Sequence, residues 1–381
     1  MNLNQICGGL RRASGVLALQ NASQKNAALK SVIDSINKNR AAILCANKSD
    51  VERARQNGTS EALVDRLSLN DARLDAICDS VQIVIDQTDP IGKVEAGWET
   101  PKGLQIKQVR VPLGVVAIIY ESRPNVTVDA FCLAYKSANA ILLRGSSSAL
   151  ESNKAICAAI KEGLSACDGG IPEAVELLQS QSHDDVDAIL SARGLIDVVL
   201  PRGGKKLIQS VVQNARVPVI ETGSGVCHLY VDDEGDLVMA LNIAENAKIQ
   251  RPGVCNAIEA ILVNKNILQK FLPALEERFN GRVVFHADND CLEALKNSAQ
   301  KNGRASCVVP AADQDFGNEF LDYECLVHAV ENVEQAIEYI NSHNTKHSEC
   351  IVTENRSRAR AFQSKVDAAC VYVNASTRFT D

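Results

Sequence analysis

The sequence predicts an α/β protein with two doubly wound parallel-sheet domains, and three observations support this prediction. The chain has 381 residues, more than one ordinary hydrophobic core needs, so two domains are expected. From Gly114 onward, short runs rich in β-branched residues alternate with helical segments. These runs are apolar throughout, which is typical of parallel strands that helices cover on both faces.

The composition indicates a soluble globular protein and argues against several classes of partner. Hydrophobic residues make up 46% of the chain and charged residues 23%. No long apolar segment or secretory signal is evident, so we expect a cytoplasmic protein without a membrane partner. The net charge of −7 is spread along the chain, which disfavours nucleic acid. The 13 cysteines lack a CxxC pair or a repeating spacing, so we expect neither disulfides nor a bound metal.

The first ninety residues have apolar side chains three and four apart, which predicts helices that cover a sheet face. Residues 94–111 then change character. They contain a Pro-Lys-Gly turn, and apolar residues alternate with polar ones through Leu104, Ile106 and Val109. This pattern predicts an exposed hairpin suited to pairing with another subunit, and therefore a homo-oligomer.

The alternating series after Gly114 divides into two domains, 1–228 and 229–381, with the 94–111 hairpin interrupting the first. In the first domain the predicted strands are 114–120, 140–145, 174–179, 196–203 and 217–223, with helices at 127–139, 147–164, 184–194 and 205–216. In the second domain they are 228–232, 257–264, 283–288, 323–330, 349–354 and 369–376, with helices at 236–250, 265–279, 290–297, 333–343 and 357–366. Ligands of such sheets gather at the carboxyl ends of the strands.

Cys255 is the candidate nucleophile. A helical run ends at Gln250, Arg-Pro-Gly breaks it, and Cys255 then leads into an apolar strand. A thiol at such a turn can face a cleft, and Lys248 and Arg251 are close enough in sequence to favour the thiolate. The alternative is that Cys255 is a small buried hydrophobic residue, as most free cysteines are.

Two strand-to-helix junctions are candidate phosphate sites, although the chain has no GxGxxG motif. In the first, Arg144 closes a strand, and Ser146, Ser147 and Ser148 open a helix whose amides could bind an anion. One of these serines could instead simply cap the helix. In the second, Gly203 and Gly204 allow close backbone approach at a helix start.

Two polar residues at strand ends are further candidates. Glu221 follows an apolar strand and precedes a glycine turn, where its carboxylate could transfer a proton or remain a solvated turn residue. Asn125, after the strand that ends in Tyr120, offers an amide donor for an oxyanion, although an asparagine beside proline is often structural.

Several of these stretches together resemble the γ-glutamyl phosphate reductase family, within the aldehyde dehydrogenase superfamily. The resemblance covers essentially the whole chain. It rests on VPLGVVAIIYESRPNVTVDA, ANAILLRGSSSA, LPRGG, VPVIETGSGVCHLYVD, NAKIQRPGVCNA, HSECIVTE and VDAACVYVNASTRFTD. It implies an aldehyde dehydrogenase-like fold in which the first domain binds the dinucleotide and the second is catalytic.

The resemblance implies NADPH-dependent reduction of L-glutamyl 5-phosphate to L-glutamate 5-semialdehyde and phosphate, in proline biosynthesis. Cys255 matches the superfamily nucleophile, whose thiolate would displace phosphate and hold the acyl group as a thioester. Asn125 and the Cys255 amide match the oxyanion hole. Glu221 matches the base of hydrolytic relatives and would here be a proton shuttle or a structural carboxylate.

The cofactor and substrate contacts follow from the same matching. Arg144 occupies the position where the superfamily has a cofactor-binding lysine. Ser147 occupies the position where enzymes that prefer NAD often have a glutamate that binds the ribose. A serine in place of that glutamate favours NADP, because it removes a charge that would repel the 2′-phosphate. Glu319 matches the superfamily's ribose-binding glutamate. The substrate carries a carboxylate and a phosphate, and arginine can bind both. The candidate substrate ligands are the arginines within the resembling motifs, Arg123, Arg251 and Arg378. Each could instead be an ordinary surface residue.

The sequence departs from the family pattern in two places. Val226 stands where we expect asparagine, which should weaken a local hydrogen bond. The sequence ends at Asp381, whereas the family continues through a glycine-rich loop beside the active site and an oligomerising segment. We expect activity and dimerisation to depend on that segment.

Two other classes of function compete with a reductase. A cysteine acyltransferase or hydrolase would need a histidine near Cys255, and none of the 6 histidines lies in an evident pairing motif. A non-catalytic interaction protein that kept the fold is the third possibility.

Overall fold

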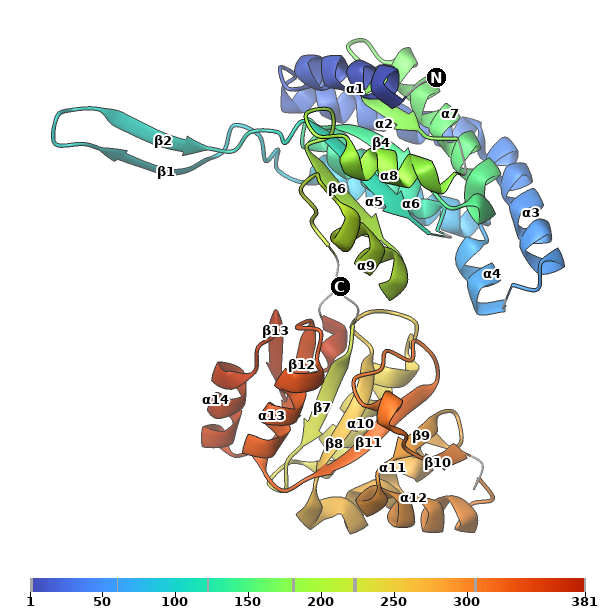
Figure 1. Cartoon of the computed structure of the whole chain (residues 1–381), viewed down its shortest axis with the longest axis vertical. Helices are drawn as coiled ribbons and strands as arrows, with labels where there is room; N and C mark the ends of the chain where they lie inside the picture. The colour runs from blue at the N-terminus through green and yellow to red at the C-terminus, as the bar shows by residue number, and fades with distance from the viewer. Residues whose placement is uncertain are drawn as a thin grey trace. The chain divides into compact units, whose positions relative to one another are not determined.

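The computed structural model divides into two compact units, Met1–Thr222 and Gly223–Asp381 (Figure 1). The structure describes residues 3–59, 61–121, 123–179, 182–221, 225–304 and 307–379. The sequence-based boundary at 228 falls inside strand β7 (Cys227–Val231), which is wholly buried in the second sheet. The boundary is therefore earlier, between 222 and 223, because a strand cannot be divided between two cores.

The first unit begins with helices, as the 3.6-residue apolar periodicity predicts. They are α1 (Leu3–Leu17), α2 (Ala22–Lys38), α3 (Arg40–Gln56), α4 (Glu61–Leu67) and α5 (Asp71–Asp86). A capping box starts α2: the Asn21 side chain accepts from the Gln24 amide, and the Gln24 side chain accepts from the Asn21 amide, both at 3.0 Å. The buried face of α2 packs on α7, so these helices belong to the first core.

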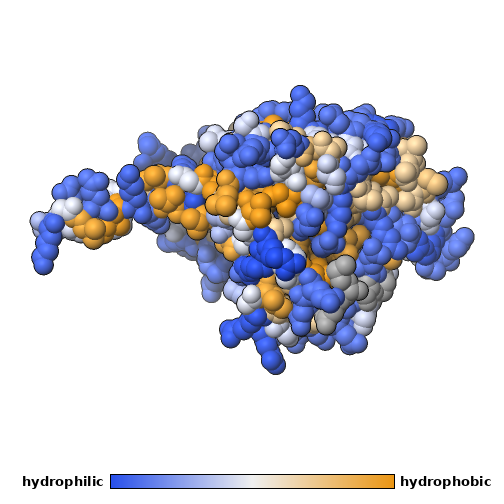
Figure 2. Space-filling view, turned by 90° about the horizontal axis from the view of Figure 1, so that it is seen from above, coloured by the Kyte–Doolittle hydropathy of each residue, from blue (hydrophilic) through white to orange (hydrophobic). Residues whose placement is uncertain are grey.

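The predicted hairpin is present as antiparallel strands β1 (Val94–Glu99) and β2 (Gln105–Val109). Figure 1 shows it projecting from the first unit, and Figure 2 shows hydrophobic side chains on it and at its base. Trp98 is 54% exposed and Leu104 62% exposed. The hairpin therefore has no core of its own.

The first sheet is parallel, with strand order β5-β4-β3-β6. Its strands are β3 (Val115–Tyr120), β4 (Ala140–Arg144), β5 (Val175–Leu177) and β6 (Val198–Arg202). The connecting helices are α6 (Asn125–Lys136), α7 (Leu150–Ala166), α8 (His183–Ser191) and α9 (Lys205–Asn214). Because β4 and β6 lie on opposite sides of β3, the strand order reverses at β3, where doubly wound sheets bind ligands.

One predicted strand of the first unit is wrong. Within 217–223, the described residues make only an isolated bridge, between Val219 and Val199. Pro218 has no amide proton, which explains why the segment does not continue a ladder. Residues 222–224, part of the predicted glycine turn, lie outside the described residues.

The second unit contains a parallel sheet with strand order β10-β9-β11-β8-β7-β12-β13. Besides β7, its strands are β8 (Ile258–Asn264), β9 (Val284–Ala287), β10 (Val308–Pro310), β11 (Glu324–Val330), β12 (Ser348–Val352) and β13 (Cys370–Val373). Its helices are α10 (Leu237–Ile249), α11 (Leu268–Phe279), α12 (Asn289–Lys301), α13 (Val333–His343) and α14 (Arg356–Lys365). The short strand β10 was not predicted. The doubly wound parallel fold is confirmed in both units.

Each unit buries its own hydrophobic core. The first core includes Cys7, Cys78, Cys132 and Cys157, and the main core of the second unit includes Cys227, Cys291, Cys325 and Cys350. No helix in the described part of the chain is long and apolar enough to cross a membrane.

Candidate active site

Cys255 lies on an exposed turn whose neighbours are buried. Helix α10 ends at Ile249 and strand β8 begins at Ile258, so the intervening turn delivers Cys255 to the amino end of β8. Cys255 is exposed, whereas Asn256 is 1% exposed. The alternative that Cys255 is a buried core residue is therefore wrong for this unit.

Two hydrogen bonds hold the backbone of this turn from other elements. The Cys227 thiol, at the start of β7, lies 3.2 Å from the Cys255 carbonyl oxygen. The buried Thr377 hydroxyl donates to the Asn256 carbonyl oxygen at 2.6 Å. Thr377 belongs to a short 3-10 turn, η6 (Thr377–Phe379), that follows β13. These contacts thus hold the peptide groups on both sides of Asn256, the first of which joins Cys255 to Asn256.

Gly225 makes the closest approach to this turn. A Cβ placed on Gly225 would lie 1.6 Å from the Cys255 carbonyl oxygen and 2.4 Å from its Cα. Only glycine fits there without moving the Cys255 backbone.

The buried cysteines contrast with Cys255. Burial raises the pKa of the Cys132, Cys325 and Cys350 thiols to about 12. Burial, followed by the Glu349 carboxylate, also raises the pKa of Cys227 well above its ordinary value. A buried thiol with a raised pKa is a poor nucleophile, so these residues are structural.

The two basic residues expected to favour the thiolate differ in environment. Lys248 is fully buried, and its ammonium pairs with the Glu259 carboxylate at 2.6 Å. Burial raises the pKa of Glu259 to about 7, although Lys248 opposes the shift. Lys248 thus forms an internal ion pair, whereas Arg251, which is close to Cys255 in the sequence, is exposed.

Glu319 and Arg378 both belong to the surroundings of the Cys255 turn. One Glu319 carboxylate oxygen accepts the Gly225 amide proton at 2.6 Å. Arg378 follows Thr377, and its Nε lies 3.3 Å from the side-chain oxygen of Gln250. Glu319 therefore contacts the Cys255 turn through Gly225, and Arg378 contacts it through Gln250.

The position that departs from the family pattern has a defined environment. The Val226 side chain is 3% exposed, and its amide donates to the Thr345 hydroxyl at 2.9 Å. Side chains therefore bind the amides of Gly225 and Val226, and the Cys227 thiol binds the Cys255 carbonyl.

The residues around Cys255 precede strands rather than follow them. Gly225 precedes β7, Cys255 precedes β8, Glu319 precedes β11 and Thr345 precedes β12. The turn thus lies at the amino edge of the second sheet. The general expectation of ligands at carboxyl ends applies to the first sheet only.

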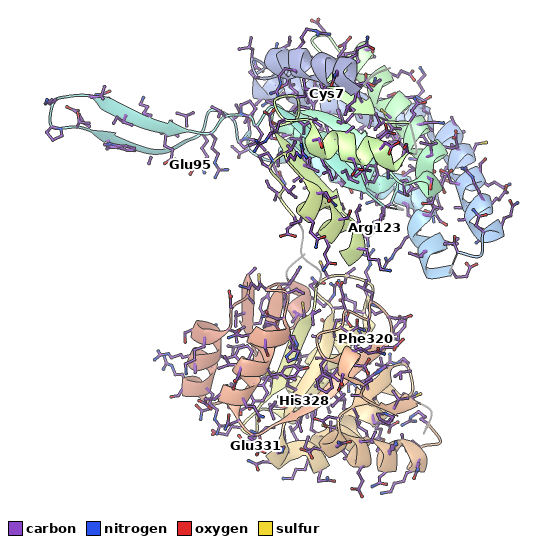
Figure 3. The ribbon with its side chains drawn as sticks, in the orientation of Figure 1. Cys7, Glu95, Arg123, Phe320, His328 and Glu331 are labelled. Carbon is purple, nitrogen blue, oxygen red and sulfur yellow. The ribbon has the colours of Figure 1, made fainter. Side chains whose placement is uncertain are left out.

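In the first unit, Asn125 is the first residue of α6, after the carboxyl end of β3. Its side-chain amide donates to Asp129 at 2.9 Å. Burial raises the pKa of Asp129, and hydrogen bonds from Asn125 and Ser80 oppose the shift. An asparagine amide has two protons, so one remains for another acceptor. Arg123, labelled in Figure 3, is half-buried just before this helix.

The first predicted phosphate junction is rearranged. Ser146 precedes a short 3-10 turn, η1 (Ser147–Ala149), and α7 begins only at Leu150. The fully buried Asp50 carboxylate accepts the Ser152 amide at 2.8 Å and the Ser152 hydroxyl at 2.6 Å. Asp50 therefore caps α7, and its first-turn amide at Ser152 is not available to a phosphate.

Other groups at this junction suit an anion. Arg144 ends β4, and its Nε is buried with no hydrogen-bond partner among the described residues. Ser147 is exposed, and the Ser146 and Ser148 hydroxyls lie 2.7 Å apart. A buried guanidinium nitrogen without a partner is costly, so this nitrogen suits a ligand acceptor.

The second junction already holds a carboxylate. The Glu121 side chain accepts the Gly204 amide at 2.9 Å, at the start of α9. A Cβ on Gly203 would lie 2.6 Å from the same carboxylate oxygen, so Gly203 leaves room for it. Glu121 is exposed, unlike Asp50, so a ligand could displace it without opening the core. Glu221 is also exposed, at the end of the described part of the first unit.

The structure thus groups the predicted residues by unit. At the strand ends of the first sheet lie Asn125, Arg144, Ser146, Ser147, Gly203 and Gly204. Around the Cys255 turn lie Arg251, Glu319 and Arg378. Sequence reasoning missed Asp50, Glu121, Gly225 and Thr377, whose roles come from contacts with residues distant in sequence. GSGVC carried a usable signal, since a glycine before a strand often marks close backbone approach.

Two doubly wound sheets and an exposed cysteine on a fixed turn characterise an aldehyde dehydrogenase-type oxidoreductase. The family model described as "Aldehyde dehydrogenase family" matches residues 15–307. An acetylating aldehyde dehydrogenase from Geobacillus thermoglucosidasius shares the fold, with a TM-score of 0.70 at 17% identity over 98% of this chain and 86% of that one.

More similar relatives define the particular family. The γ-glutamyl phosphate reductase of Alkaliphilus oremlandii is 46% identical over 100% of this chain and 89% of its own. The crystal structure of that enzyme from Thermotoga maritima has a TM-score of 0.91 and 45% identity, over 99% of this chain and 89% of its own. The chain belongs to the γ-glutamyl phosphate reductases of the aldehyde dehydrogenase family. This membership favours an oxidoreductase over the hydrolase and the non-catalytic alternatives.

Proposed function

We propose that the protein catalyses NADPH-dependent reduction of L-glutamyl 5-phosphate to L-glutamate 5-semialdehyde and phosphate, through a thioester on Cys255. The reaction would serve proline biosynthesis. The observation that carries the proposal is that Cys255 is exposed on a turn whose peptide groups are held by Thr377 and Cys227.

Cys255 would act first as a nucleophile and then as a leaving group. Its thiolate attacks the acyl carbon, the C–O bond to phosphate breaks, and phosphate leaves with that electron pair. The resulting thioester keeps the acyl group electrophilic while the site excludes water. The thiolate returns when the aldehyde leaves. NADPH, when bound, supplies the hydride that reduces the acyl group.

The oxyanion that forms at the acyl carbon needs fixed hydrogen-bond donors. We assign this role to the Cys255 amide and to the Asn125 side-chain amide. One proton of that side chain is donated to Asp129, and the other would be donated to the oxyanion. Glu221 is exposed, so it is a candidate to exchange protons with solvent during the reaction.

The residues present fit a dinucleotide with a 2′-phosphate. Arg144 offers a buried Nε that has no hydrogen-bond partner among the described residues, and the exposed Ser147 carries a hydroxyl instead of a carboxylate that would repel an anion. Ser146, Gly203 and Gly204 would contribute hydroxyl and backbone groups, with Glu121 displaced from the Gly204 amide. Glu319 is the candidate ribose ligand.

Arginines would bind the anionic groups of the substrate. Arg251 and Arg378 flank the Cys255 turn in the same unit, and Arg123 is half-buried before α6. A guanidinium pairs with a carboxylate or a phosphate through two parallel hydrogen bonds, which suits both ends of glutamyl phosphate.

The proposal includes a homo-oligomer in the cytoplasm. The hairpin exposes apolar residues on an antiparallel ribbon, which a second copy could cover. All 13 cysteines are described and free, in keeping with a reducing compartment.

The experiment is phosphate-dependent reduction of NADP with glutamate semialdehyde, the reverse reaction. Cys255→Ser should abolish turnover but keep saturable NADPH binding, measured by fluorescence titration. Cys45→Ser is the matched control, because Cys45 is also exposed but lies on α3. Full turnover in Cys255→Ser, or no dependence on phosphate, would reject the mechanism.

A further inference from the structure

The backbone of Gly225 and that of Cys255 are in direct contact. The missing Cβ of Gly225 leaves the space that the Cys255 carbonyl group occupies. Cys227, two residues later, bonds the same carbonyl through its thiol at 3.2 Å. Any displacement of the 225–227 segment must therefore displace the Cys255 peptide as well.

The Gly225 amide is held by a single carboxylate. Glu319 Oε1 accepts its proton at 2.6 Å, although the two residues are 94 positions apart in the chain. Hydrogen bonds to a charged acceptor are about twice as strong as neutral ones. The next amide, of Val226, has its own partner in Thr345 at 2.9 Å. Among the described residues, Glu319 and Thr345 thus bind the amides of Gly225 and Val226.

The loop that carries Glu319 is itself clamped by His286 of β9. One ring nitrogen of His286 lies 2.9 Å from Asp315, and the other lies 2.9 Å from Glu324. The Phe320 ring, labelled in Figure 3, lies 4.8 Å from the His286 ring. The clamp therefore contacts the loop on both sides of Glu319.

We infer that Glu319 is a positioning residue for Cys255, acting through Gly225, and that the His286 clamp holds Glu319 in place. The inference rests on the proposed role of Cys255 as nucleophile. It differs from the role that family resemblance gives Glu319, because the hydrogen bond to Gly225 exists without a cofactor.

Hydrogen exchange of the free enzyme tests this inference directly. The informative amides are those of Val226 and Ala257, which bond Thr345 and Val254 rather than Glu319. In Glu319→Ala, exchange at both should accelerate about tenfold, the effect of losing one charge-assisted hydrogen bond. In Glu319→Gln, exchange should stay near the wild-type rate, because the amide oxygen accepts the same proton.

Kinetics and binding separate positioning from cofactor recognition. Glu319→Ala should lower kcat about tenfold even at saturating NADPH, where a loss of cofactor affinity no longer limits the rate. Asp313→Ala is the matched control, an exposed carboxylate on the same loop. His286→Phe, which keeps a ring beside Phe320 but cannot bond either carboxylate, should show the same faster exchange. It also keeps the test open if Glu319→Ala does not fold.

The exchange result decides the inference. Unchanged exchange at Val226 and Ala257 in both Glu319→Ala and His286→Phe would overturn it, and a tenfold weaker NADPH affinity would then make Glu319 a cofactor ligand only. This failure is distinct from failure of the proposed function. If Cys255→Ser kept its turnover, Cys255 would not be the nucleophile, but the hydrogen-exchange rates of the Glu319 and His286 variants would not be affected.

Discussion

At the scale of single residues, the Cys255 turn depends on what neighbouring positions lack as much as on what they contain. Gly225 has no side chain, Val254 and Ala257 close the turn with a backbone bond of 3.1 Å, and Cys227 contributes only a thiol. These features make the turn sensitive to substitutions that leave the reactive sulfur unchanged.

We predict that Gly225→Ala inactivates the enzyme without preventing folding. The new methyl would overlap the Cys255 carbonyl, so the turn must shift. Overpacking of this kind costs about 1–3 kcal/mol of stability. Displacing a reacting group by about 1 Å lowers kcat roughly 100-fold. Steady-state kinetics and thermal denaturation measure the two effects.

The control for this substitution is Gly9→Ala, within α1, where a new Cβ meets no atom within 4 Å. It should leave kcat unchanged and raise stability slightly, because alanine favours a helix over glycine. Wild-type kcat in Gly225→Ala would contradict the close contact.

Thr377→Val should lower kcat while Thr377→Ser restores it. Valine keeps the shape of threonine but leaves the buried Asn256 carbonyl without its 2.6 Å donor. Losing this buried hydrogen bond costs about 0.5–1.5 kcal/mol, and the turn can move in response. We expect kcat to fall about tenfold. Equal loss in the serine variant would show that packing, not the hydroxyl, matters.

The residues that sequence reasoning could and could not identify differ in the range of their contacts. The exposed turn that carries Cys255 was predictable because a broken helix followed by an apolar strand is a local pattern. Thr377 was not, because its partner Asn256 is 121 positions away. Asp50 likewise lies 102 positions from Ser152, so the filled cap of α7 could not be predicted from the serines themselves.

At the scale of elements, apolar strands and amphipathic helices followed the sequence closely, and the failures have physical causes. Strand β10 has only three residues, too few for a periodic signal. The 217–223 segment reads as a strand by its β-branched residues, but Pro218 prevents a continuous ladder. The helix expected from Ser147 starts late because η1 intervenes.

The hairpin is the element whose stability must come from elsewhere. A two-stranded ribbon is at best marginally stable in water, and exposed ion pairs such as Glu95–Arg110, at 2.5 Å, add little. Its apolar side chains therefore favour contact with another surface.

We predict that Trp98→Lys converts the proposed homo-oligomer to monomers. Trp98 is 54% exposed on β1, and a charge there opposes burial against a second copy. Sedimentation velocity measures the change in mass. Lys102→Ala, at the exposed tip between the strands, is the control and should leave the mass unchanged. An unaltered oligomer in Trp98→Lys would exclude this face of the hairpin from the interface.

At the scale of the whole molecule, two cores imply that the units can respond separately to acid. Burial opposes ionisation of Asp288 in the second unit. Hydrogen bonds from His328 and from the Ala329 and Cys291 amides outweigh it and lower the pKa of this carboxyl to about 2. Because the folded pKa lies below the ordinary 3.8, the stabilisation is complete above pH 4 and is lost as pH falls through 2.

We predict that the free energy of unfolding of the second unit falls between pH 4 and pH 2, with Asp288 contributing on the order of 2 kcal/mol. Denaturant titrations at several pH values measure this slope. Asp288→Asn should flatten it and lower stability at neutral pH, while Asp313→Asn, an exposed control, should do neither. Identical slopes in wild type and Asp288→Asn would assign acid sensitivity to other groups.

Each of the two cores contains buried cysteines that become reactive only when that core unfolds. Four cysteines are shielded in the first core and four in the main core of the second unit. A maleimide applied during partial denaturation would therefore mark whichever core has opened, and peptide mass spectrometry would read the marks. The native cysteines thus report separately on the unfolding of each core, and no probe has to be introduced.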